Sequence, residues 1–136
     1  MITTILLASL IAIAGVAIPA PVGSAPAAAP TSSASAAPLR HVVLFDFRDT
    51  ATPADIARIE AAFAALRSSI REVKGLEWGT NVSPENLANG FTHCFIVTFD
   101  DAAGRDIYLP HPAHQAFVTL AGPYIEKALV VDFFVR

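Results

Sequence analysis

Five side chains in this sequence are candidates for acid–base chemistry at a site: His41, His93, His111, His114 and Tyr108. A neutral imidazole can act as a general base near neutral pH, and a phenol can donate a hydrogen bond to an oxygen that gains negative charge. Each of these residues also has a common structural role. Where the fold places them therefore decides which role applies.

His111 and His114 are separated by two residues, a spacing at which two imidazoles could bind one metal ion. A protein metal site usually needs three or four ligands, together with hydrogen bonds that orient them. No acidic partner is obvious beside the pair in the sequence. We therefore predict neither a metal site nor a cofactor.

His114 is expected near the start of a helix that begins at Pro112. The helical repeat places it on the same side as four apolar residues, Phe117, Val118, Ala121 and Ile125. Burial and the positive end of the helix both disfavour the imidazolium form, which leaves the neutral imidazole that a general base needs. The alternative is a core histidine that is hydrogen-bonded to a backbone carbonyl.

The other candidates also have two interpretations each. Tyr108 could donate its hydroxyl hydrogen to a developing enolate oxygen, or it could close one end of the core as an amphipathic aromatic residue. His41 and His93 each begin the apolar side of a predicted strand, so they could line one cavity or cap the strand ends. His111 lies between two prolines, which favours a residue of a rigid turn.

The elements that position these residues can be read from the apolar pattern. Strands are expected where β-branched and aromatic residues gather, at 40–48, 76–82, 91–99 and 129–135. Thr52 and Pro53 predict the start of a helix that ends near Gly75. Further helices are expected at 100–109 and from residue 112 onward. The order β-α-β-β-α-β predicts an α+β fold, the ferredoxin-like sandwich.

Both sides of the strands at 40–48, 91–99 and 129–135 are largely apolar. Two helices can cover only one face of a four-stranded sheet, so the other face would expose valine, leucine, isoleucine and phenylalanine side chains. A patch of that size on a single chain usually marks an interface. We expect a homodimer in which two sheets pack face to face and form an α/β barrel.

Residues 1–38 carry no charged side chain, whereas all 9 Lys and Arg and all 12 Asp and Glu residues come after them. The apolar run at 5–18 suits a secretory signal peptide and is short for a membrane span. We expect a signal peptide or N-terminal anchor at 1–23, a disordered Ala/Pro/Ser linker at 24–38, and a folded domain at 39–136.

This leader predicts a secreted or periplasmic protein. Two alternatives stay open, an uncleaved segment that anchors the chain in a membrane and a start codon assigned upstream of the true one. No lysine or arginine precedes the apolar run, which weakens the signal-peptide prediction. The net charge of −3 argues against binding to nucleic acid, which needs a clustered positive surface. Cys94 is the only cysteine, so no intramolecular disulfide can form.

Four stretches together resemble the stress-responsive dimeric α/β-barrel (Dabb) family: RHVVLFDF, WGTNVSPENLANGFTHCFIVTF, YLPHPAHQAF and LVVDFF. The resemblance spans residues 39–136, and HPAHQAF is its most specific part. It implies a ferredoxin-like sandwich that dimerises through its sheets, in agreement with the expectation from the two-sided apolar strands.

In a plant polyketide cyclase of this family, a histidine and a tyrosine promote an intramolecular aldol condensation. The resemblance implies His114 as the general base and Tyr108 as the oxyanion donor, and it matches His41, His93 and His111 to further histidines at a ligand pocket. Most members of the family have no established reaction.

Two functions therefore follow from the resemblance. The first is a stress-related protein that holds a small hydrophobic or aromatic molecule in an apolar pocket edged by histidine and tyrosine. The second is a cofactor-free lyase or cyclase of the aldol type, and a cofactor-free oxygenase is a weaker third option. Export would argue against acyl thioesters of coenzyme A as substrates, because these are cytoplasmic.

Overall fold

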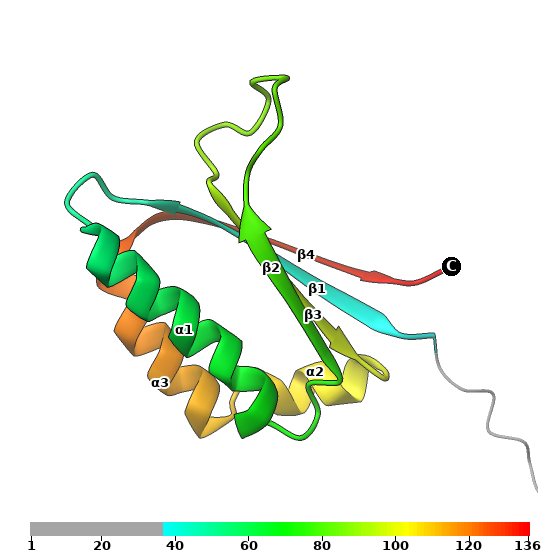
Figure 1. Cartoon of the computed structure of the whole chain (residues 1–136). Coiled ribbons are helices and arrows are strands. Elements are labelled where there is room, and N and C mark those ends of the chain that lie inside the picture. The colour runs from blue at the N-terminus through cyan, green and yellow to red at the C-terminus, as the bar shows by residue number, and fades with distance from the viewer. Residues whose placement is uncertain (1–36) are drawn as a thin grey trace, which may run out of the picture. The chain divides into compact units, whose positions relative to one another are not determined.

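The computed structural model describes residues 37–136. The leader predicted at 1–23, and all but the last two residues of the linker predicted at 24–38, lie outside the described residues. Along the chain the elements are β1 (Leu39–Phe47), α1 (Pro53–Ser69), β2 (Gly75–Thr80), β3 (His93–Phe99), α2 (Ala102–Tyr108), α3 (Pro112–Ala121), the 3₁₀ turn η1 (Gly122–Tyr124) and β4 (Ile125–Phe134) (Figure 1).

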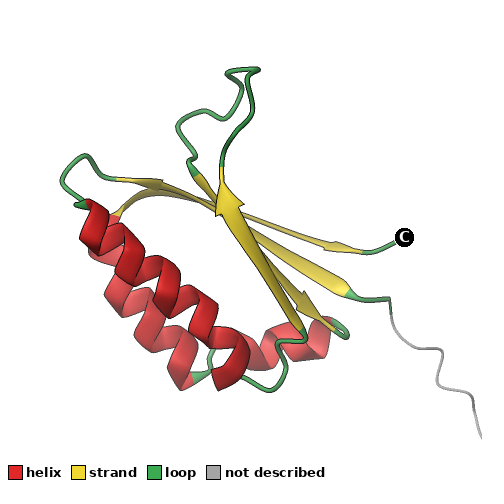
Figure 2. Ribbon diagram, in the orientation of Figure 1, coloured by secondary structure: helices red, strands yellow, loops and turns green. Residues whose placement is uncertain are grey.

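The four strands form one antiparallel sheet in the order β2-β3-β1-β4. Helices α1, α2 and α3 all lie on one face of this sheet (Figure 2). This is the ferredoxin-like α+β sandwich that the order of elements predicted. No helix among residues 37–136 is long and apolar enough to cross a membrane.

Helix α1 begins as predicted, with Thr52 as its N-cap and Pro53 in its first turn. Thr52 and Asp55 form a capping box, in which each side chain accepts a hydrogen bond from the other residue's backbone N–H. The predicted end near Gly75 is wrong, because α1 ends at Ser69 and Gly75 begins β2. Ile70, the extended residue after the helix, is still fully buried, which explains why the apolar pattern runs past the end of α1.

Helix α3 begins at Pro112, as predicted, but it ends at Ala121. Ile125 is therefore not on its apolar face and is instead the first residue of β4, four residues before the predicted start of that strand. Pro123 lies in the intervening turn η1, where its missing N–H costs no helical hydrogen bond. Pairing with Phe47 of β1 extends β4 back to Ile125.

The core lies between the sheet and the helices and is rich in aromatic rings. Phe63 of α1 stacks on Phe95 of β3 with ring centroids 4.0 Å apart, and the ring of Phe117 on α3 is centred 4.9 Å from Phe63. Burying a side chain of this kind stabilises the fold by roughly 1.5–3 kcal/mol. These contacts fix α1 and α3 over the sheet and so set the geometry of the space between them.

No helix of the described residues covers the opposite face of the sheet (Figure 2). Three apolar residues of β4 that point to this face, Leu129, Val131 and Phe133, are 44%, 47% and 48% exposed. The neighbouring strands add further apolar side chains to the same face, namely Val42, Leu44, Cys94 and Ile96. We call these seven residues the outer face, and the expectation that one side of the sheet is both apolar and free of helices is met.

Candidate functional site

A cavity of about 390 Å³ lies between the sheet and helices α2 and α3. Alternate residues of the paired strands β1 and β4 face it, so the register sets its two ends. His41 and Asp132 lie at one end, and Phe45 and Ala128 lie at the other. The remaining lining side chains are mostly apolar: Val43, Phe63, Tyr108, Leu109, His114, Phe117, Val118, Ala121, Gly122, Ile125 and Val130.

His114 is the third residue of α3, as the sequence predicts, and it lines the cavity. Its Nδ1 lies 2.9 Å from the carbonyl oxygen of Leu109 and donates to it, because a carbonyl can only accept. Burial lowers the pKa of His114 below its usual range, an effect that the Leu109 bond opposes and that nearby His41 and His111 reinforce. His114 is thus both a carbonyl-bonded histidine and a cavity residue, so the two interpretations of it are compatible.

Tyr108 is the last residue of α2 and is 1% exposed. Its ring packs against three others, those of Phe99, His41 and His114, at centroid distances of 5.2, 5.8 and 4.3 Å. Burial raises the pKa of Tyr108, so its hydroxyl keeps its proton and acts as a hydrogen-bond donor.

His41 on β1 is 5% exposed and lines the cavity beside Tyr108. Its Nδ1 lies 2.7 Å from Oδ1 of Asp132, the residue opposite it on β4. Burial acts to raise the pKa of Asp132, but hydrogen bonds from His41 and Arg105 outweigh burial and lower it. The Asp132 carboxylate is therefore ionised at neutral pH and can only accept, so His41 Nδ1 donates to it.

Three polar atoms at this end of the cavity have no hydrogen-bond partner among residues 37–136: Nε2 of His41, the hydroxyl of Tyr108 and Nε2 of His114. Every described polar side-chain atom that is sealed from solvent does have a partner. The three atoms are thus accessible, and they belong to rings that line the cavity. With both Nδ1 atoms donating to the protein, the neutral forms of the two imidazoles present acceptors at Nε2, and the Tyr108 hydroxyl can donate.

The structure does not bring His93 or His111 to this cavity. His111 is the N-cap of α3, and its Nδ1 accepts a hydrogen bond from the backbone N–H of Ala113. His93 lies at the other end of the sheet, where its two ring nitrogens are 3.0 Å from Glu60 and 2.8 Å from Thr92. Both histidines are thus bonded within the protein. His111 has the structural role of a turn residue, and His93 has that of a residue at a strand end.

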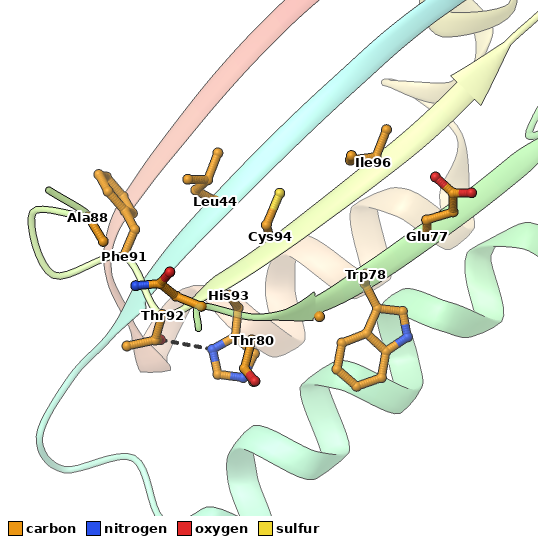
Figure 3. Close-up of a pocket in the computed structure, with 12 residues that line it drawn as sticks. Leu44, Glu77, Trp78, Thr80, Ala88, Phe91, Thr92, His93, Cys94 and Ile96 are labelled. Carbon is orange, nitrogen blue, oxygen red and sulfur yellow. Dashed lines mark hydrogen bonds between the residues drawn. The ribbon is translucent and has the colours of Figure 1, made fainter. Parts of the chain in front are cut away.

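A second hollow, of about 330 Å³, lies over the β2–β3 end of the sheet (Figure 3). In Figure 3, Leu44, Cys94 and Ile96 point to one side of the sheet, and Trp78 and His93 point to the other. His93 lines this hollow, but both of its ring nitrogens are already bonded to protein side chains. The hollow therefore lacks the free imidazole that the first cavity has, and we take the first cavity as the candidate site.

Two residues of the site, Asp132 and Arg105, were missed by reasoning from the sequence. Asp132 is 91 positions from His41, and only the register of β1 on β4 brings them together. One signal was available, since Asp132 is the single charged residue within the apolar run at 128–135.

No group of three or more His, Cys, Asp or Glu side chains in residues 37–136 is arranged to hold a metal ion.

The fold and the site together define a ferredoxin-like domain with an apolar cavity that histidine and tyrosine edge at one end. Residues 39–135 match the family described as the stress responsive A/B barrel domain, Dabb, and the chain belongs to this family. It is 38% identical over 96 residues to the stress-response A/B barrel domain-containing protein HS1 of Arabidopsis thaliana, an alignment that covers 71% of this chain and 88% of that protein. It is 30% identical over 98 residues to olivetolic acid cyclase of Cannabis sativa, covering 72% of this chain and 97% of the cyclase.

Solved structures of similar proteins share this fold. The hydroxynitrile lyase of Passiflora edulis superposes with a TM-score of 0.70 at 27% identity, covering 74% of this chain and 94% of the lyase. A protein described as dimeric and ferredoxin-like, of unknown function, from Thermobifida fusca superposes with a TM-score of 0.64 at 25% identity, covering 74% and 92% of the two chains. Relatives and structural neighbours of this chain thus include a cyclase and a lyase.

Proposed function

We propose that the cavity between the sheet and helices α2 and α3 binds a small hydrophobic or aromatic molecule with a polar head. The observation that carries this proposal is the set of three free polar atoms, on His41, Tyr108 and His114, at one end of an otherwise apolar space. Ligand sites commonly combine apolar walls with a few convergent polar groups. An unpartnered donor or acceptor in such a place is costly unless a ligand or water occupies it.

The hydrogen-bonding capacity of the site indicates the chemistry of the head. The Tyr108 hydroxyl can donate, so a ligand with an acceptor such as a carbonyl oxygen fits it. His41 and His114 accept through Nε2, so the ligand must also offer hydrogens, as a hydroxyl group does. A compound with a hydroxyl beside a ketone and an apolar ring or chain satisfies both requirements, and its apolar part would lie towards Phe45 and Ala128.

A second function, acid–base catalysis on a carbonyl compound, is favoured by the same three atoms. His114 would take a proton from an acidic C–H bond, and Tyr108 would stabilise the resulting enolate oxygen. Two proteins similar to this chain are named as a cyclase and a lyase, which supports chemistry of this kind. Neither function requires a cofactor.

We propose in addition that the protein is a homodimer formed through the outer face of the sheet. Leu129, Val131 and Phe133 form a continuous apolar surface there, and large apolar patches usually mark interfaces. Structural neighbours are described as dimeric ferredoxin-like proteins, which supports the same assembly. Neither nucleic acid nor a membrane is needed as a partner of the domain.

Native mass spectrometry of the protein purified from its own source tests the binding function. We expect a mass excess that matches one small molecule per chain and that disappears on denaturation. A probe of the proposed class, 1-hydroxy-4-phenylbutan-2-one, should bind to ligand-free protein, whereas butylbenzene, which lacks the polar head, should bind more weakly. Equal binding of the two compounds would contradict the role given to the polar end.

Exchange of the ketone's α-hydrogens for deuterium tests the catalytic function. Wild-type protein in D₂O should accelerate exchange at the α-carbons of 1-hydroxy-4-phenylbutan-2-one, followed by proton NMR. The His114→Ala variant, assayed at a saturating concentration of the probe, separates the two functions: loss of exchange with the probe bound indicates catalysis, and binding without exchange in the wild type indicates a carrier.

Export and a role in stress are further proposals. Export is supported by the charge-free apolar run at 5–18, and the stress role by the description of the family. Cell fractionation together with the intact mass of the mature chain tests export. A cleaved chain outside the cytoplasm is expected, and a full-length chain in the membrane fraction would indicate the anchor instead.

A further inference from the structure

Three charged or titratable side chains from three different elements form a continuous hydrogen-bonded chain at the polar end of the cavity. Arg105 of α2 donates from Nη1 to Oδ2 of Asp132 on β4 over 2.9 Å. Oδ1 of the same carboxylate accepts from Nδ1 of His41 on β1 over 2.7 Å. Nε2 of His41 is the free end of this chain.

We propose that Arg105 and Asp132 are positioning residues that hold His41 as a base of the cavity, with its lone pair on Nε2. This inference deepens the proposed function and rests on it, because it assigns a second base beside His114. The two oxygens of Asp132 are bonded to His41 and Arg105, so its effect is exerted through the imidazole. A carboxylate on Nδ1 selects the tautomer whose Nε2 is free to accept a proton.

The geometry is fixed by the sheet and not by a flexible loop. His41 and Asp132 are paired residues in the register of β1 on β4, and both point to the helix side. Arg105 occupies the second oxygen of the carboxylate, which opposes its rotation away from His41. Arg105 is itself held by Asp106, which accepts from its Nε and Nη2.

The two cavity histidines differ in what supports them. His114 donates to the carbonyl of Leu109, a neutral acceptor, whereas His41 donates to an ionised carboxylate. A carboxylate stabilises the imidazolium that forms when the ring takes a proton, and a carbonyl does so less strongly. His41 therefore has a support that His114 lacks, and this support fits it to act as a second base of the cavity.

The step can be written with its charges balanced. Nε2 of His41 takes a proton from an α C–H bond of a bound ketone, and the electron pair of that bond forms the C=C bond of the enolate. The carbonyl oxygen gains the negative charge and accepts a hydrogen bond from Tyr108. The imidazolium faces the Asp132 carboxylate, and the proton, or a deuteron from solvent, returns to the same carbon.

The tautomer of His41 can be observed without any ligand, by ¹⁵N NMR of protein labelled at histidine, with the His41→Gln variant used for assignment. For the neutral imidazole of wild-type His41 we expect the proton on Nδ1 and the lone pair on Nε2. The Asp132→Asn variant keeps the shape but allows the amide to donate to Nδ1, so a mixture containing the Nε2-protonated form is expected. A wild-type His41 protonated at Nε2 would overturn the proposal, even if the variant failed to fold.

The functional readout uses the hydroxyketone as its probe. Asp132→Asn should slow α-hydrogen exchange at least ~10-fold while the probe still binds, and Asp132→Glu should recover part of the rate. The matched control is Glu126→Gln, which neutralises an exposed carboxylate of the same strand that lies outside the cavity and should leave tautomer and rate unchanged. If Asp132 only tethers β4 to α2, Asp132→Asn will lower thermal stability with the tautomer unchanged.

Failure of the proposed function and failure of the positioning role give different results. If the probe does not bind wild-type protein, the proposed function fails while the NMR result still decides the tautomer. If the probe binds and exchanges, and the rate in Asp132→Asn equals that of the wild type, the positioning role fails alone.

Discussion

Tyr108 and His114 lie with their ring centroids 4.3 Å apart although they belong to different helices. Tyr108 is the last residue of α2, and His114 is the third residue of α3. The short turn between them is held by the carbonyl of Leu109, which accepts hydrogen bonds from both His114 and Gln115. The phenol and the imidazole are thus held together by a local backbone structure.

Replacement of Tyr108 by phenylalanine removes only the hydroxyl, which has no partner among the described residues. The free energy of unfolding should therefore change by less than about 0.5 kcal/mol. Affinity for 1-hydroxy-4-phenylbutan-2-one should fall about 10-fold, the equivalent of one hydrogen bond of roughly 1.4 kcal/mol. Thermal unfolding and calorimetric titration measure the two effects, and unchanged affinity would remove Tyr108 from the ligand site.

Replacement of His114 by alanine should weaken probe binding by roughly 5- to 10-fold, through loss of one acceptor worth about 1 kcal/mol. The fold should persist, because Gln115 still donates to the Leu109 carbonyl over 2.7 Å. Gln115→Ala is the matched control: it removes the other bond to the same carbonyl from an exposed position outside the cavity. If the two variants bind the probe equally, His114 acts only on the backbone.

The pKa of His114 is lower in the folded chain than its ordinary value of 6.5, chiefly because the ring is buried. As pH falls through 6.5 the unfolded chain takes up this proton before the folded chain does. The contribution of His114 to the free energy of unfolding is therefore fully present above pH 6.5 and is lost as the pH falls towards the pKa of His114 in the folded chain. Denaturant unfolding of wild type and His114→Ala between pH 5 and pH 8 measures this effect. The free energy of unfolding should fall less towards low pH in the variant than in the wild type. An equal fall in both proteins would contradict the lowered pKa of His114.

Enlargement of Ala128 to leucine should close the apolar end of the cavity. Ala128 pairs with Phe45 on the helix side of β4, so added atoms enter the space that the ligand's apolar part would fill. Probe affinity should drop at least ~10-fold with little loss of stability, since the position is exposed in the absence of ligand. Glu126→Leu, an exposed site on the same strand that does not line the cavity, provides the control for added apolar area.

A charge on the outer face should dissociate the dimer. Val131→Lys places an ammonium group in the apolar surface formed with Leu129 and Phe133, where burial of an unpaired charge costs several kcal/mol. Light scattering at micromolar concentration should give the mass of a dimer for wild type and of a single chain for the variant. Ala61→Lys, on the exposed side of α1, should remain dimeric. A wild-type protein with the mass of one chain would refute the assembly.

The parts of the fold that sequence reasoning predicted are those with local causes. Thr52 and Asp55 cap α1 through neighbouring backbone groups, and Pro112 begins α3, which fixed His114 at its third residue. The end of α1 was misplaced because Ile70 remains in the core after the helix has stopped. A buried extended residue and a buried helical residue give the same apolar signal over a few positions.

The candidate site also combines features that have local causes with features that depend on the tertiary structure. The family resemblance paired Tyr108 with His114, and the short turn between α2 and α3 brings both residues to one cavity. The support of His41 by Asp132 depends on strand register across the whole domain, which no local pattern determines. His93 is instead hydrogen-bonded to Glu60 and Thr92. Glu60 lies on α1, and the sequence alone does not show which residues of a helix face a given end of a strand.

Titration of the histidine-labelled protein with 1-hydroxy-4-phenylbutan-2-one, followed by ¹⁵N NMR, tests the central claim most directly. The Nε2 signals of His41 and His114 should move in a saturable way, while those of His93 and His111, which lie outside the cavity, should stay in place. Saturable shifts at His93 with none at His41 or His114, or no saturable shift at any histidine, would contradict the account.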